Sequence, residues 1–177
     1  VNYRSLFSTY QNSGPNAVFD GVNVLALGNG AADSATARLL FHGDTINGNS
    51  GNGLRLEALN GATLTASIED TAIINNGGYG ILATANGANT EFNLLMSGSN
   101  DLSGNTLGPI GPLTFANMKQ VALEFSGDFS NNPTSDGLTV SLTNIPNAFV
   151  AFNGPATVDN NAGNGINISL TNVANAG

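Results

Sequence analysis

Apolar and polar residues alternate along several short stretches of the chain. The apolar members of the clearest stretches are Leu54, Leu56 and Ala58, then Ile81, Ala83 and Ala85, then Leu138, Val140 and Leu142, and last Ile166, Ile168 and Leu170. Val22, Val24 and Ala26 form an earlier copy. A period of two over six residues predicts a strand with one buried face. No part of the pattern has the period of a helix.

These stretches recur at a nearly constant interval along the chain. A glycine precedes each clear stretch, and an asparagine precedes the glycine by four to six residues. The asparagines are Asn49, Asn76, Asn105, Asn132 and Asn161, at successive steps of 27, 29, 27 and 29 residues. Two more apolar positions come before each asparagine: first Phe41, Ile68, Met96, Phe125 and Phe152, then Ile46, Ile73, Leu102, Phe129 and Val158. One repeat therefore predicts a strand, a bend, a short strand, an asparagine turn and a strand.

This repeat predicts an all-β fold, a right-handed parallel β-helix (β-solenoid) of about six coils with three short strands each. Each strand would pair with its equivalents about 4.8 Å above and below. Asparagines stacked in this way can hydrogen-bond to one another as a ladder. A β-sandwich or closed barrel also has short, regularly spaced strands, but it does not require the same residues to recur in register. We expect residues 1–177 to form a single β-helix domain.

Two segments depart from the repeat. The first coil, residues 3–29, has an insertion around YQNSGPNAVFD. The segment TLGPIGPLTFANM is predicted to be a loop that bulges from the fourth coil, because Pro109 and Pro112 cannot donate to a strand ladder. Gly111 is predicted to take the place of the repeat glycine there.

The composition argues against several classes of partner. Only 9% of the residues are charged, and four Lys and Arg against twelve Asp and Glu give a net charge of -8. This balance disfavours nucleic acid and anionic lipid, and no apolar run approaches the roughly 20 residues of a membrane span. There is no cysteine for a disulfide or a thiolate metal site. A chain rich in Asn, Thr and Gly and poor in Lys suggests an extracellular or bacterial cell-surface location.

The repeats IINNGGYGILATAN and VDNNAGNGINISLTN resemble those of the pectate-lyase-like right-handed β-helix superfamily. They look most like its noncatalytic bacterial surface and adhesin members. The resemblance covers nearly the whole chain and implies the fold. It does not imply one activity, because the superfamily includes lyases, hydrolases, tailspikes, adhesins and structural rods.

No catalytic, cofactor-binding or metal-binding residue is predicted. Pectate lyases use an Arg or Lys base beside acidic calcium ligands, and none of Arg4, Arg38, Arg55 and Lys119 is predicted to have that setting. The polygalacturonase-like members have a Gly-His-Gly element, whereas His42 lies in FHGD without the preceding glycine. His42 has no His or Cys partner and is expected to be a surface or turn residue. Arg55 and Glu57 are expected to form an exposed ion pair or to be solvated separately.

Asp101 and Asp128 occupy the same offset in two successive repeats, so the fold would stack them about 4.8 Å apart. Two carboxylates at that distance repel unless they point into water or share a cation, and oxygen-rich turns suit Ca²⁺. Both readings, solvated turn residues and a calcium site, stay open on the sequence.

Neither end of the sequence has a cap, and the chain stops at TNVANAG just after a complete coil. We therefore expect a segment of a longer surface protein or a subunit that stacks end to end, with Leu6, Phe7 and Val18 pointing inward at the junction. The expected function is a structural or adhesive segment that can form a fibre. Its partners would be copies of itself or flanking coils, joined through terminal strand edges, with cell-surface glycans as further candidates. The alternative is a polysaccharide-binding or polysaccharide-degrading module, although the chain has no Trp and few Tyr for stacking on sugars: Tyr3, Tyr10 and Tyr79.

Overall fold

The computed structural model describes residues 2–6, 9–11, 19–32, 34–131, 134 and 136–177, and for residues before 19 it describes the backbone alone. Within this part of the chain every regular element is a β-strand, and the paired strands are parallel. No helix that could cross a membrane is found among the described residues. The predicted parallel β-helix is confirmed.

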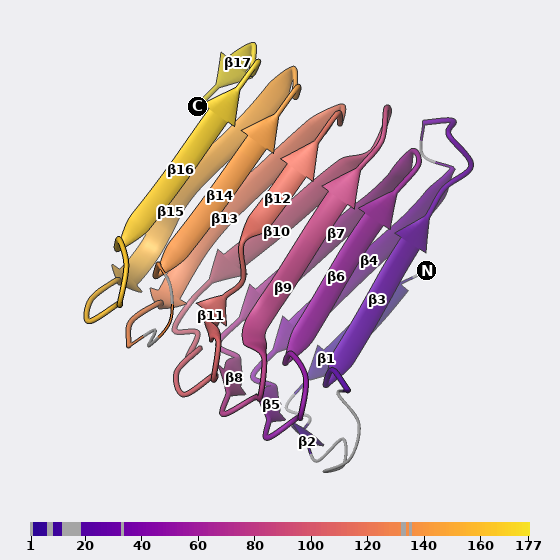
Figure 1. The fold of residues 1–177 in the computed structure, drawn as a ribbon. Coiled ribbons are helices and arrows are strands. Elements are labelled where there is room, and N and C mark those ends of the chain that lie inside the picture. The colour runs from indigo at the N-terminus through magenta and orange to yellow at the C-terminus, as the bar shows by residue number, and fades with distance from the viewer. Residues whose placement is uncertain (1, 7–8, 12–18, 33, 132–133, 135) are drawn as a thin grey trace.

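Two large parallel sheets lie face to face, and a small third sheet lies along one edge (Figure 1). The first sheet contains, in spatial order, β1 (Asn2–Leu6), β4 (Ala35–His42), β7 (Ala62–Glu69), β10 (Glu91–Ser97), β13 (Gln120–Asp128), β15 (Asn147–Thr157) and β17 (Asn175–Ala176). The second contains β3 (Val22–Leu27), β6 (Leu54–Leu59), β9 (Tyr79–Asn86), β12 (Leu113–Ala116), β14 (Leu138–Thr143) and β16 (Ile166–Thr171). The third contains β2 (Thr9–Gln11), β5 (Thr45–Asn47) and β8 (Ala72–Ile74).

The pairing register repeats the interval predicted from the sequence. Thr36 pairs with Thr63, Thr63 with Glu91 and Glu91 with Gln120, at steps of 27, 28 and 29 residues. The six strands on the main path of the second sheet are therefore separated by about five turns of the chain.

The first coil is longer than the others, as predicted, but the additional residues form two insertions where one was predicted. The step from Asn2 to its partner Arg38 is 36 residues. Part of the excess lies between β2 and β3, where residues 12–18 are outside the described part of the chain. The rest is an insertion that the sequence analysis missed: residues 28–34 connect β3 to β4, whereas Asn60 and Gly61 alone connect β6 to β7.

The core fills the space between the two large sheets. The alternate apolar residues of β6, β9 and β14 point inward as predicted, and the Leu, Ile and Val residues among them are fully buried. The rings of Phe92 on β10 and Phe115 on β12 lie 4.9 Å apart across the core. The two apolar positions before the asparagine are buried in the first four repeats, with at most 1% exposure at Phe41, Ile68, Met96, Phe125, Ile46, Ile73, Leu102 and Phe129. In the fifth repeat Phe152 is 38% exposed and Val158 is partly buried, because this coil lies at the end of the core.

The predicted loop around Pro109 is wrong, because the segment keeps its place in the second sheet. Pro109 lies in β11 (Gly108–Ile110), which pairs with β9. One extra residue follows, since Ile110 pairs with Ile81 and Thr114 with Thr84. Pro109, not Gly111, takes the place of the repeat glycine.

The proline is tolerated there for a local reason. The equivalent glycine, Gly53, donates its N–H to Tyr79 in the following coil. An N–H at Pro109 would likewise point toward the following coil. Among the described strands β11 pairs only with β9, in the preceding coil, so the proline removes no hydrogen bond between paired strands.

The third strand of each coil is less regular than predicted. It forms β2, β5 and β8 in the first three coils, but in the next two the ladder is continued by single bridges, from Ala72 to Asp101 and from Asp101 to Asp128.

Candidate functional sites

The residue before each repeat asparagine adopts a left-handed backbone conformation. Its φ angle is 67° at Gly48, 54° at Asn75, 69° at Gly104, 59° at Asn131 and 53° at Asn160. Glycine adopts this conformation freely, and asparagine does so more readily than most other residues. The turn therefore explains the first member of each Asn-Asn or Gly-Asn pair.

The second member of the pair forms a buried ladder. The side-chain amide of Asn49 donates to Asn76 Oδ1 at 3.0 Å, and that of Asn76 donates to Asn105 Oδ1 at 2.9 Å. The same oxygens also accept the backbone N–H groups of Asn49 and Asn76, at 3.1 and 3.0 Å. All three side chains are at most 4% exposed. The predicted ladder is confirmed for these residues, whereas Asn132 lies outside the described residues.

The repeat glycine leaves room for the asparagine of the next coil. A Cβ atom on Gly53 would lie 2.8 Å from Asn76 Nδ2, and one on Gly137 would lie 2.5 Å from Asn161 Nδ2. Asn76 and Asn161 thus hold equivalent places, as predicted. Gly165, in the last coil, meets no such amide, because its nearest neighbour is Val158 at 3.4 Å.

A second asparagine ladder, which the sequence analysis missed, runs along the outside. Asn144 donates to Asn117 Oδ1, and Asn172 donates to Asn144 Oδ1, both at 2.9 Å. All three residues are exposed and follow a strand of the second sheet. These three asparagines are spaced by 27 and 28 residues, and this spacing is the feature of the sequence from which the outer ladder could have been predicted.

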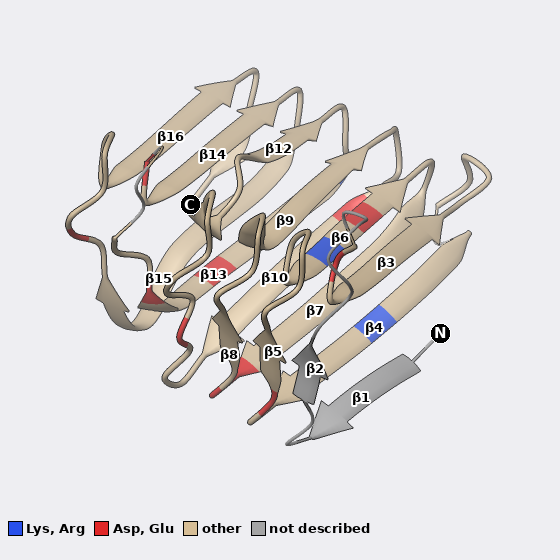
Figure 2. Cartoon of the chain, turned by 60° about the horizontal axis from the view of Figure 1, so that its bottom comes forward, with Lys and Arg blue, Asp and Glu red and all other residues tan. Residues whose placement is uncertain are grey.

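Acidic residues lie at the turns beside β5 and β8, along the edge that carries the third sheet (Figure 2). We call Asp44, Asp70, Asp101 and Asp128, which lie within two register positions of one another in successive coils, the acidic edge. Asp101 and Asp128 are adjacent in the ladder, as predicted. Each caps its own turn, because Oδ1 accepts the backbone N–H of Ser103 or Ser130, two residues on, at 3.0 Å. Both readings of this pair, solvated turn residues and a calcium site, stay open.

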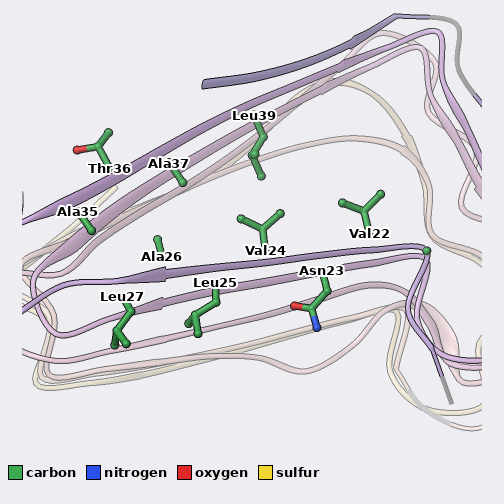
Figure 3. Close-up of a pocket in the computed structure, with 11 residues that line it drawn as sticks. Val22, Asn23, Val24, Leu25, Ala26, Leu27, Ala35, Thr36, Ala37 and Leu39 are labelled. Carbon is green, nitrogen blue, oxygen red and sulfur yellow. The ribbon is translucent and has the colours of Figure 1, made fainter. Parts of the chain in front are cut away.

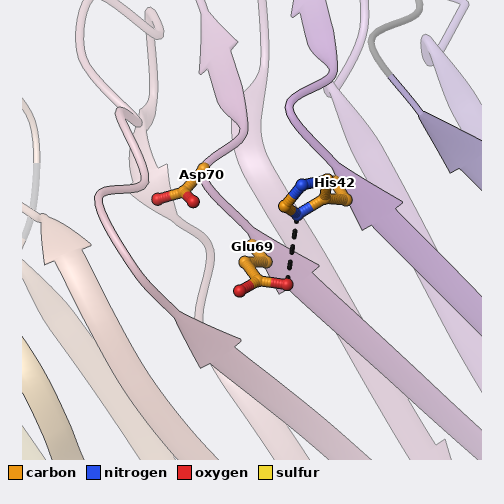
Figure 4. Close-up of side chains that lie close together, drawn as sticks. All are labelled: His42, Glu69 and Asp70. Atoms are coloured by element: carbon orange, nitrogen blue, oxygen red, sulfur yellow. Dashed lines mark hydrogen bonds and ion pairs between the residues drawn. The ribbon is translucent and has the colours of Figure 1, made fainter.

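His42, Glu69 and Asp70 come together at one end of the acidic edge (Figure 4). His42 and Glu69 are register partners at the ends of β4 and β7, and Nδ1 of His42 lies 3.1 Å from Oε2 of Glu69. The metal-ligating atoms of the three side chains all lie within 4.8 Å of one another. In the sequence His42 stands alone as a candidate, because only the register of β4 on β7 reveals its acidic neighbours.

The other predicted polar residues lie apart from this cluster. Arg55 and Glu57 form the expected ion pair on the outer face of β6, with a separation of 3.7 Å. Lys119 pairs with Glu91 at 2.5 Å. Tyr79 lines a surface hollow of about 340 Å³ together with Asn52, Leu82 and Leu107.

Asp136 holds the turn of the last coil. Its carboxylate accepts the backbone N–H of Asn164 at 2.7 Å, the side-chain amide of Asn167 at 3.2 Å and the hydroxyl of Thr139 at 3.0 Å. These hydrogen bonds, led by that from the Asn164 backbone, lower the pKa of Asp136 below its ordinary value.

An apolar hollow of about 620 Å³ lies between β3 of the first coil and β4 of the second (Figure 3). Val22, Val24 and Ala26 point into it from β3, and Ala37 and Leu39 from β4. Leu25 and Leu27 point to the other side and are more than half exposed. The predicted inward side chains of Leu6, Phe7 and Val18 lie outside what is described.

The last coil presents core positions to solvent. Ile166, Ile168 and Leu170 on β16 are 44%, 43% and 48% exposed. Their register partners on β14, the residues Leu138, Val140 and Leu142, are fully buried. The difference arises because β16 is the edge strand of the second sheet and, in the described chain, no strand lies beyond it.

No protein-family model matches the chain, and neither the curated proteins nor the solved structures searched contain a significant match.

Proposed function

We propose that the chain is a structural or adhesive segment of a bacterial extracellular or cell-surface protein, in which further coils continue the β-helix across its end strands. It is a noncatalytic relative of the pectate-lyase-like β-helices. The observation that carries this proposal is the exposed apolar row Ile166, Ile168 and Leu170, which is in register with a fully buried row one coil below.

The inward side chains of the second sheet stack in columns that run from one end strand, β3, to the other, β16. Val22, Val24 and Ala26 on β3 start the columns, and the exposed row on β16 ends them. A strand of a second copy placed on β16 through its β3 edge would bring these apolar rows together. It would also satisfy the unpaired backbone groups of both edges. Contact between copies of the chain would then lengthen the rod.

Sedimentation velocity over a range of protein concentrations tests this proposal. We expect the unmodified chain to form species larger than a monomer as its concentration rises, and Ile168→Asp to stay monomeric because the charge would be buried in the junction. Ser169→Asp is the matched control, since Ser169 is adjacent to Ile168 in β16 but belongs to the outer face of the sheet. A chain that stays monomeric at all concentrations contradicts stacking of copies and leaves flanking coils as the covering element.

A polysaccharide-binding function is the second candidate, and the hollow at Tyr79 is the observation that favours it. Tyr79 supplies an aromatic side chain, and Ser50 and Asn52 supply polar groups. Titration of acidic and neutral polysaccharides, with and without Ca²⁺, would show binding that Tyr79→Ala removes. Release of unsaturated sugar products in the same samples would indicate a lyase, whereas an absence of binding would contradict this candidate.

A further inference from the structure

We propose that His42, Glu69 and Asp70 form a binding site for a first-row divalent metal ion, of which Zn²⁺ is the best match. No metal site at His42 is predicted from the sequence, because the chain has no second His and no Cys. The register of β4 on β7 supplies what the sequence lacked, since it places Glu69 beside His42 and Asp70 immediately after it.

The separations suit a single ion. Zinc binds imidazole nitrogen and carboxylate oxygen at about 2.0 to 2.2 Å, so two ligands of one tetrahedral ion lie about 3.3 to 3.6 Å apart. Nδ1 of His42 and Oε2 of Glu69 are 3.1 Å apart. All three ligating atoms fit within 4.8 Å, and modest rotation of the Asp70 side chain would complete the set.

The chemistry of the ligands selects the ion. An imidazole nitrogen with two carboxylates suits Zn²⁺ and its transition-metal neighbours, whereas Ca²⁺ and Mg²⁺ prefer oxygen alone. Three protein ligands also leave a coordination position for water, as in open zinc sites. The site therefore differs in chemistry from the all-oxygen pair Asp101 and Asp128.

The surroundings favour a cation. Within the described residues neither Glu69 nor Asp70 forms an ion pair with Lys or Arg. The side chains of His42 and Glu69 are 34% and 47% exposed, so an ion can reach them. The Oδ1 atom of Asp70 accepts the backbone N–H of Ser99 at 2.8 Å, and rotation toward the ion would exchange this exposed hydrogen bond for a metal contact. The rest of the acidic edge adds negative potential.

Asp70 stands where the neighbouring coils have glycine. Its φ angle is 48°, and the same turn has Gly43 at 65° and Gly98 at 70°. Glycine fits this backbone conformation better than aspartate does. Asp70→Gly should therefore keep the fold while removing one ligand, which makes it a clean probe of the site.

Titration with ZnCl₂ of the protein without a polyhistidine tag tests the proposal by calorimetry and by ¹⁵N NMR of its one histidine. We expect one Zn²⁺ per chain, a shift of the Nδ1 resonance of His42, and a higher melting temperature in the presence of Zn²⁺. Glu69→Gln and Asp70→Gly should each weaken binding at least tenfold, and His42→Ala should abolish it. Asp101→Asn with Asp128→Asn is the matched control and should bind normally.

Three results would overturn the proposal. They are an unshifted His42 resonance at saturating Zn²⁺, equal binding by the His42→Ala variant, and loss of binding in the Asp101 and Asp128 control alone. Circular dichroism without metal shows whether each variant is folded, and Asp70→Gly keeps the test valid if another variant unfolds.

Discussion

The asparagine pair is the residue-scale unit of this structure, and its two members have different tasks. The first member adopts the left-handed conformation of the turn, where either Gly or Asn occurs. The second member, as at Asn76, serves two neighbouring coils at once: Oδ1 accepts from Asn49, and the side-chain amide donates to Asn105. Because these groups are buried, each hydrogen bond is costly to leave unmade.

Asn76→Ala should therefore destabilise the protein by about 2 to 4 kcal/mol, because the backbone N–H and side-chain amide of Asn49 lose their shared acceptor. Urea unfolding measures the change. Asn86→Ala is the control in the same coil, since Asn86 is exposed at the end of β9, and it should cost less than about 0.5 kcal/mol. Equal losses in both variants would mean that the buried ladder contributes no special stability.

At the scale of elements, the sequence predicted those features that recur in successive coils. The inward parity of β6 and β9 and the asparagine corner were predictable because similar residues return every 27 to 29 positions. The strand β11 was missed because Pro109 is a general signal against a strand, and only the pairing on one side removes the objection. The cluster around His42 was missed because the residues at its positions differ between coils, so that Asp70 is equivalent to Gly43 and Gly98 and leaves no repeated pattern.

The turn before β16 depends on one carboxylate, so its stability should depend on pH. The pKa of Asp136 is lowered in the folded chain, so its contribution is present above the pKa of the unfolded chain and is lost as pH falls through the folded pKa. In an acid titration followed by NMR, the amide proton of Asn164 should shift with a midpoint below that of an aspartate in an unstructured peptide. Asp136→Asn should remove this step, and a midpoint at or above the peptide value would contradict the assignment.

At the scale of the whole molecule, each coil contacts mainly the coils directly before and after it. Stability in such an array is the sum of contributions from single repeats and from the interfaces between neighbours. The middle coils, with β7 and β9, have neighbours on both sides and contain the fully buried core. The coil that contains β16 has one neighbour among the described coils and keeps its apolar row exposed.

Amide hydrogen exchange at low protein concentration should follow this order. We expect the slowest exchange in β7 and β9 and the fastest, among the second-sheet strands, in β16, because the last coil can open without disturbing the rest. Mass spectrometry of peptic peptides resolves these strands. Uniform exchange along the chain would show instead that the rod opens as one cooperative unit.

The parallel pairing of the strands also determines what symmetry an assembly of this chain can have. All strands of a sheet point the same way, so a copy that continues the parallel pairing must place its β3 surface against the β16 surface of its neighbour. Joining the two is a heterologous contact, which does not close into a twofold dimer. Copies that meet in the way proposed above would form polar filaments whose length is limited by concentration and by whatever blocks an end.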